Sequence, residues 1–478
     1  MRRALRLVVA AAVAAVTGRA AAQVADPAEE RLRRQDDRLS AAEERLRGQD
    51  ERIAALLRAL EQQAEETRKL RAALDARPAP PASPPFPWQE ALRAFKVSGF
   101  VQADAVFHRQ SSQDEVGPSG QPLNQDRFVI PRAHLRVDAE KWMLLAAIEL
   151  EASTLNGPAL RAVEASLSFR WQGPDREGPP LLVSSLGLFK IPFGFEVPEL
   201  DPQRFFLERS TTGRALFPGT YDLGFRVQGG YRFLRYAFAV MNGEPIGETS
   251  FPARDPNAAK DLVGRIGAEG APTPFLRLRA GVSALTGTGF HQGTPATKDT
   301  LVWRDANGDG LVTIDEIQVI PGAAATPSQN FHRFALGADL GVTARLPVLG
   351  DLTLYGEVVR ASNLDRGVEP ADPVGAGRDF RELGFYVGLM QEVTRYAMVG
   401  VRYDRYDPDA DASEQRGVSL VPSSHAYSTV AVTGAARYPP GRLLFEYDHN
   451  TNTLGRTPGG LPTTLADDAF TLRGEVVF

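Results

Sequence analysis

Apolar and polar residues alternate in short segments from residue 96 to the end of the chain. In "RAHLRVD" (residues 132–138) and "VEASLSFR" (residues 163–170), every second residue is apolar, and Val163 belongs to the apolar set. A period of two is the pattern of a strand with one apolar and one polar face. The predicted strands lie at residues 96–108, 126–138, 141–152, 160–171, 181–191, 221–232, 233–242, 261–270, 275–286, 332–346, 351–361, 380–391, 394–404, 428–437, 441–449 and 469–478.

The connections between these segments sort by length. Links from even to odd segments are mostly short, as at "RFLR" and "YPPG". Links from odd to even segments are mostly long, at residues 109–125, 153–159, 192–220, 243–260, 287–331, 362–379, 405–427 and 450–468. Short turns at one end and long loops at the other are typical of a bacterial outer-membrane barrel. Residues 95–478 are therefore predicted to form an all-β transmembrane barrel of about 16 antiparallel strands, ending on Phe478 at the membrane interface.

The first 94 residues have a different pattern. Residues 1–22 combine a positive start, an apolar stretch and an A-x-A cleavage site, as in a secretory signal peptide. Residues 27–75 are highly charged, with apolar residues at heptad spacing, and predict an N-terminal α-helical coiled coil. Residues 76–94 form a proline-rich linker. We expect the coiled coil to lie in the periplasm, with the cell wall as a candidate partner.

Composition and missing motifs exclude several classes of function. The chain contains no cysteine, which rules out disulfides, thiol nucleophiles and thiolate metal sites. Its net charge of -5 argues against a nucleic-acid-binding protein. The motifs of serine hydrolases, zinc proteases and P-loop enzymes do not occur, so we expect neither an enzyme nor an organic cofactor.

Cations gather on one long loop and on the predicted inner wall. A barrel of this size encloses a wide aqueous channel, so the loop at residues 192–220 is predicted to fold inward and narrow it. Arginine suits such a site because its planar fork pairs with oxyanions. The candidate anion-binding residues are Arg204, Arg209 and Arg214 on the loop, and Lys190, Arg132, His134, Arg136 and Arg226 on the wall. Glu149, Glu151, Glu164 and Asp222 are predicted on the same inner face, so a mixed, weakly selective network is the alternative.

Residues 186–210, "LGLFKIPFGFEVPELDPQRFFLERS", resemble the phosphate-selective porin O and P family of outer-membrane porins. The matching residues are Phe189, Lys190, Pro192, Phe193, Gly194, Glu196, Glu208, Arg209 and Ser210. The resemblance implies a water-filled channel for small anions such as phosphate or polyphosphate, formed by a homotrimer surrounded by outer-membrane lipids. One position departs from the pattern, because Tyr221 and Asp222 stand where family members often have an arginine. An acidic group at the channel mouth would weaken anion preference.

A second function remains open at this point. The barrel could be plugged and serve only as an anchor, with the coiled coil as the functional arm of an envelope-tethering protein. Pore currents and deletion of residues 27–75 discriminate between the two hypotheses.

"DANGDGLVTIDE", residues 305–316, matches the calcium loop of an EF-hand. The candidate calcium ligands are Asp305, Asn307, Asp309, Leu311, Thr313 and Glu316. The flanking residues are β-branched and short of helix formers, so no helix pair is expected to open in response to calcium. We therefore interpret the loop as a local clamp in the longest surface loop, and calcium as its candidate ion.

Overall fold

The computed structural model of the chain describes residues 58–59, 61–69, 71, 94–110, 124–155, 157–174, 177–246, 255–416, 418–422, 425–456 and 462–478. The chain divides into two compact units, Met1–Phe86 and Pro87–Phe478. In the first unit the described residues are helical and exposed. The signal peptide, most of the predicted coiled coil and most of the linker lie outside the described residues. Among the helices that are described, none is long and apolar enough to cross a membrane.

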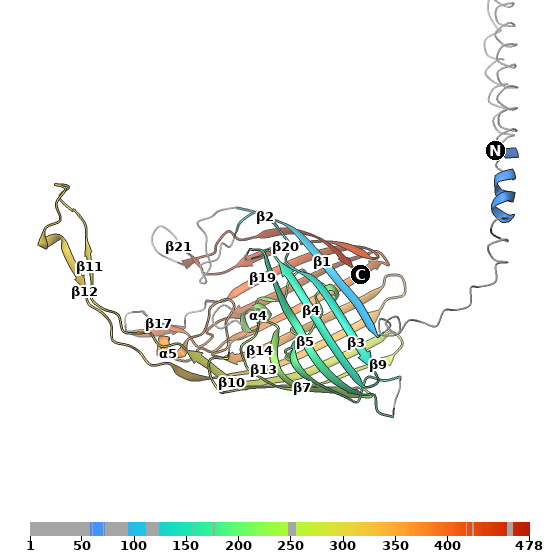
Figure 1. Cartoon of the computed structure of the whole chain (residues 1–478), viewed down its shortest axis with the longest axis horizontal. Helices are drawn as coiled ribbons and strands as arrows, with labels where there is room; N and C mark the ends of the chain where they lie inside the picture. The colour runs from blue at the N-terminus through green and yellow to red at the C-terminus, as the bar shows by residue number, and fades with distance from the viewer. Residues whose placement is uncertain are drawn as a thin grey trace, which may run out of the picture. The chain divides into compact units, whose positions relative to one another are not determined.

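Sixteen antiparallel strands close into a barrel in the second unit (Figure 1). Each strand pairs with the next along the chain, and β23 pairs back onto β1, where Phe100 lies opposite Val477. A short strand, β2 (Arg127–Val129), also pairs with β1. All sixteen predicted segments are confirmed. The barrel strands are β1 (Phe95–His108), β3 (Ala133–Lys141), β4 (Leu144–Ser153), β5 (Ala159–Trp171), β6 (Leu182–Lys190), β7 (Tyr221–Tyr231), β8 (Leu234–Met241), β9 (Asp261–Thr273), β10 (Leu276–His291), β13 (Gln329–Arg345), β14 (Asp351–Ser362), β15 (Leu383–Thr394), β16 (Ala397–Asp407), β19 (Tyr427–Tyr438), β20 (Gly441–Thr451) and β23 (Ala469–Val477).

The two faces of the barrel wall differ in polarity. On β23, Arg473 and Glu475 are buried inside, whereas Phe470 and Leu472 are exposed on the outside. Because the barrel is closed, the backbone groups at the strand edges are hydrogen-bonded, as is required of a β-structure in a membrane. Exposed aromatic residues gather at the short turns: Trp142, Trp171, Phe233, Phe275, Tyr396, Tyr438 and Phe478. An apolar outer band with an aromatic girdle identifies a membrane-spanning barrel of the outer-membrane type.

The predicted face of Val163 is wrong. Alternation within β5 places this side chain on the outer surface, but it is 1% exposed and packs with Leu188 and Tyr221. The pairing of β4 with β5 shifts register between Glu149 and Leu150, so Val163 has no partner. A β-bulge of this kind inserts one extra, unpaired residue into a strand. Here the extra residue is Val163, and its side chain points inward.

The longest loop continues the hairpin of β10 and β13 beyond the barrel. His291 lies opposite Gln329, and the same register continues to β11 (Thr300–Trp303) and β12 (Ile317–Ile320). Figure 1 shows this ribbon projecting away from the barrel. The other loops that end at the same rim contain α5 (Pro373–Ala376) and the hairpins β17 (Ser413–Arg416)–β18 (Ser419–Pro422) and β21 (Gly455–Arg456)–β22 (Pro462–Thr463).

Candidate permeation pathway

The segment between β6 and β7, residues 191–220, contacts the inner wall on several sides. It contains a 3-10 helix, η1 (Asp201–Gln203), and the short helix α4 (Thr211–Leu216). The backbone N–H of Gly194 donates to Ser283 Oγ of β10 at 3.0 Å. The backbone N–H of Leu207 donates to Glu446 Oε2 of β20 at 3.2 Å. The segment therefore lies against strands from widely separated parts of the sheet.

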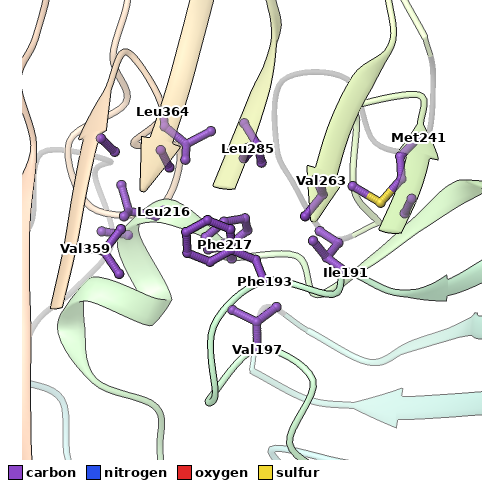
Figure 2. Packing of buried hydrophobic residues seen from close by; sticks show 14 of the residues in the cluster. Ile191, Phe193, Val197, Leu216, Phe217, Met241, Val263, Leu285, Val359 and Leu364 are labelled. Atoms are coloured by element: carbon purple, nitrogen blue, oxygen red, sulfur yellow. The ribbon is translucent and has the colours of Figure 1, made fainter. Parts of the chain in front are cut away.

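An apolar cluster holds the segment to the wall (Figure 2). Phe193 and Phe217 lie near the two ends of the segment, and their ring centroids are 4.9 Å apart. They pack in one cluster with Val263 and Leu285 from the wall. Burial of these side chains is a major source of stability for the segment, because each buried aromatic or aliphatic side chain contributes about 1.5–3 kcal/mol.

The residues that suggested the family resemblance form one interlocked turn. Gly194 has a φ of 64°, a left-handed conformation that favours glycine, and a Cβ there would collide with the carboxylate of Glu357. Glu196 accepts hydrogen bonds from the Ser210 backbone N–H at 3.0 Å and from Ser210 Oγ at 2.6 Å. Ser210 Oγ in turn accepts from the Gly213 N–H and caps α4. In this structure, Gly194, Glu196 and Ser210 shape the segment and do not line either of the two larger cavities described next.

Two cavities lie beside the segment, on the side of β3 to β7. The smaller, about 260 Å³, is lined by Arg132, Arg161, Arg204 and Arg209 among others. The larger, about 850 Å³, is lined by Arg136, Lys190 and Arg226 among others. His134, Asp201 and Tyr221 belong to both walls, so the cavities are neighbours. Together they are lined by seven arginine or lysine residues and five carboxylates.

Several predicted cations are paired with carboxylates. Arg132 contacts Glu208 and, at 3.2 Å, Asp201, and Arg204 contacts Asp201 at 2.5 Å. Arg136 contacts Asp138, Glu149 and Glu164, and His134 contacts Glu149 and Glu151. Burial alone would raise the pKa of Asp201, but the charges of Arg204 and Arg132 outweigh it and hold that pKa well below its usual range. These contacts form the structural network that was the alternative to an open anion path.

Three other cations in the cavity walls have no carboxylate within 4.0 Å among the described residues. Lys190 Nζ donates to the carbonyl of Glu199 at 2.6 Å and lies 5.4 Å from the Tyr221 ring. Arg209 donates to the carbonyls of Gly213 and Phe217. Arg226 lies over the Phe189 ring at 4.7 Å. Their positive charges are therefore not paired with a carboxylate at contact distance, and these residues line the two cavities.

Two expectations need correction. Arg214 does not line either cavity; it is exposed and donates to Thr211 Oγ1 at 3.3 Å. Asp222 is not at the mouth of the cavities either. It is 1% exposed and accepts hydrogen bonds from the backbone of Leu223 and Gly243, each at 2.7 Å. The position that departs from the family pattern is therefore occupied by a structural carboxyl group.

Sequence reasoning missed the inner-face arginines of the C-terminal half. Arg265, Arg333, Arg402, Arg442 and Arg473 all form ion pairs on the inner wall. Strand parity could have found them, because each occupies an inward position of its strand, as Arg473 does between the outward-facing Leu472 and Gly474. Their partners could not be found in this way.

The calcium loop lies at the tip of the ribbon. Asp305 accepts hydrogen bonds from the backbone N–H groups of Gly308, Asp309 and Gly310. Glu316 accepts from Thr313 and Ala306, and these bonds lower its pKa. Within the described residues, no three His, Asp or Glu side chains are grouped so that they could hold a metal ion. The carboxylates of Asp305 and Glu316 thus accept hydrogen bonds from the backbone of their own loop.

The flanks of this loop agree with the interpretation as a clamp. Strand β11 precedes it, and a 3-10 turn, η2 (Ile314–Glu316), leads directly into β12. A two-stranded ribbon thus stands where an EF-hand has two helices. Calcium binding itself stays a prediction from the sequence.

Comparison with known proteins gives the fold but no family. No known family matches the sequence, and no curated protein does. Among solved structures, OprB of Pseudomonas putida aligns with a TM-score of 0.51 at 8% identity, over 82% of this chain and 96% of that one. The outer membrane channel DcaP of Acinetobacter baumannii aligns with a TM-score of 0.49 at 12% identity, over 80% of this chain and 97% of that one. An anion-selective porin from Comamonas acidovorans aligns with a TM-score of 0.47 at 11% identity, over 80% of this chain and 99% of that one. The likeness to OprB shows that the two chains share a fold.

Proposed function

We propose that this protein is an outer-membrane porin that passes small anions through a channel narrowed by residues 191–220. The observation that supports this function is the pair of neighbouring cavities beside that segment. Cations outnumber carboxylates in their walls, and Lys190, Arg209 and Arg226 have no carboxylate partner among the described residues. Cations that line a narrow path are how an anion pore selects its solute.

Confinement strengthens the effect of these charges. The low-dielectric wall focuses the field of Lys190 and Arg226 into the cavity. An ion that passes through the cavity comes closer to them than the roughly 8 Å screening length of physiological salt. Within the class of anions, we propose phosphate and polyphosphate as the first solutes to test, because arginine recognises oxyanions with two parallel hydrogen bonds.

The test is the reversal potential of the purified full-length protein in planar bilayers under a salt gradient. We expect a potential of the sign that marks anion preference, and a decrease in current when phosphate is added as a competitor. Absence of pores would contradict the porin hypothesis, and cation preference would contradict the anion path.

A matched pair of double variants tests the cavity itself. Lys190→Gln with Arg226→Gln removes two unpaired charges from the larger cavity, so anion preference should fall strongly. Arg136→Gln with Glu164→Gln removes Arg136 and one of the three carboxylates that it contacts, which leaves the net charge of the same cavity unchanged, so the reversal potential should change little. Equal effects of the two double variants would show that unpaired charge does not set selectivity.

A further inference from the structure

Three arginines of the inner wall bind backbone carbonyls of the loop, and two of them also contact its carboxylates: Arg402 lies 3.7 Å from Glu196, and Arg473 lies 2.8 Å from Glu208. Arg402 Nη1 donates to the carbonyl of Glu208 at 2.9 Å. Arg442 Nη1 donates to the carbonyl of Arg204 at 3.2 Å. Arg473 Nη1 donates to the carbonyl of Leu207 at 2.7 Å. The three acceptors lie within five consecutive residues, so one short stretch of the loop is held at three points.

These arginines come from one side of the barrel, on β16, β20 and β23. Strands β16, β19, β20 and β23 are consecutive neighbours in the sheet. None of the three arginines lines either cavity, since the cavity walls come mainly from β1, β3 to β7 and the loop itself. The stretch at residues 204–208 is therefore bonded to β16, β20 and β23, although Glu208 also contacts Arg132, and the open space lies toward β1 and β3 to β7.

Each of the three arginines is itself held by a carboxylate, which fixes its direction. Arg473 contacts Asp104 at 2.7 Å, and Arg442 contacts Glu475 at 2.6 Å. Arg402 contacts Asp404 at 3.5 Å and lies over the Phe206 ring at 4.7 Å. A planar guanidinium can pair with a carboxylate on one edge and still donate to a carbonyl with another N–H.

We propose that Arg402, Arg442 and Arg473 are positioning residues that set the selectivity of the channel by fixing residues 204–208 against β16, β20 and β23. This proposal rests on the proposed porin function. With its carbonyls held toward β16, β20 and β23, the stretch places Arg204 and the adjacent Arg209 in the wall of the smaller cavity. Loss of these bonds lets the loop move, which widens the path and spreads the cationic side chains.

Single variants Arg402→Gln and Arg473→Gln test this in planar bilayers. We expect a larger single-channel conductance and a reversal potential shifted toward zero. Arg473→Lys keeps a cationic donor and should recover much of the wild-type behaviour. Arg265→Gln is the matched control, because Arg265 is an inner-wall arginine that pairs with Asp339 and has no contact with the loop among the described residues. It removes the same charge and should change conductance little.

Loop position is measured separately from current. The natural chain contains no cysteine, so spin labels attach only to cysteines that are introduced. We choose Gln203→Cys and Gln228→Cys, because both positions line the larger cavity. The distance distribution between them should broaden in Arg402→Gln and Arg473→Gln and stay narrow in Arg265→Gln. Where a glutamine variant fails to fold, Arg442→Gln provides the same comparison.

The outcomes distinguish failure of the porin function from failure of the positioning role. A wild-type protein without anion preference contradicts the porin proposal, whatever the arginine variants do. An anion-selective wild type with variants whose conductance, reversal potential and label distances are unchanged overturns the positioning role. A shift of equal size in Arg265→Gln would assign the effect to net charge and would also overturn it.

Discussion

The arginines inside the barrel divide by what their guanidinium groups contact. Arg132, Arg136 and Arg204 face carboxylates, whereas Arg209 is bonded to carbonyls of the turn that follows it. A paired guanidinium adds little net charge to a passage, but one bonded to neutral carbonyls keeps its charge. We therefore expect selectivity to depend on what each guanidinium contacts and not on the number of arginines.

Glu199 gives the channel a predicted pH dependence. Burial raises the pKa of this loop carboxyl to about 7, and the nearby charge of Arg204 opposes the rise. Because a raised carboxyl pKa means a neutral group below it and an anion above it, the loop gains one negative charge as pH rises from 6 to 8. We expect anion preference, measured as reversal potential, to decrease over this interval.

The control for this prediction is Glu199→Gln, which cannot titrate. Its reversal potential should vary less with pH than that of the wild type. The slope that persists belongs to other titrating groups. An unchanged slope in Glu199→Gln would contradict the role of Glu199.

The ribbon of β11 and β12 is an element that the barrel does not need. Its register continues that of β10 and β13, yet its own residues are exposed. Isolated two-stranded hairpins are only marginally stable in water, so an ion that links the ends of the tip loop would rigidify it. Calcium binding requires Asp305, Asp309 and Glu316 to direct carboxylate oxygens toward a common point.

We predict that calcium binds the tip with a Kd of about 10⁻⁴–10⁻³ M, as in extracellular modules. Isothermal titration calorimetry of the wild type should show heat in this range, and Asp305→Ala or Glu316→Ala should abolish it. The mutant barrels should stay folded, because the barrel strands pair without the loop. No heat at millimolar calcium would refute calcium binding, and unfolded mutants would refute the interpretation as a local clamp.

At the scale of the whole molecule, the barrel and the N-terminal segment are separate units. We expect the barrel to contain the channel and the predicted coiled coil to support a homotrimer. Deletion of residues 27–75 should therefore leave single-channel conductance and reversal potential unchanged. Sedimentation in detergent should show whether the trimer weakens. Negligible current in the wild type, together with loss of function on deletion, would instead favour the envelope-tethering hypothesis.

The positions of the strands, their number and the location of the long loops at one rim could all be predicted from the sequence. These features are local, because alternation along one strand records which face meets lipid. The exception is Val163, where a bulge breaks the local period. The same alternation placed Arg132, His134 and Arg136 on the inner face, where the structure also has them.

The pairing of these charges and the position of the cavities depend on the tertiary structure. The contact of Arg132 with Glu208 joins residues 76 positions apart, and that of Arg473 with Leu207 joins residues 266 positions apart. Such contacts depend on how barrel closure and loop packing bring distant residues together, and strand periodicity contains no information about them. For the same reason the sequence assigned Arg214 to the filter, whereas packing of α4 against β15 and β16 leaves it outside both cavities.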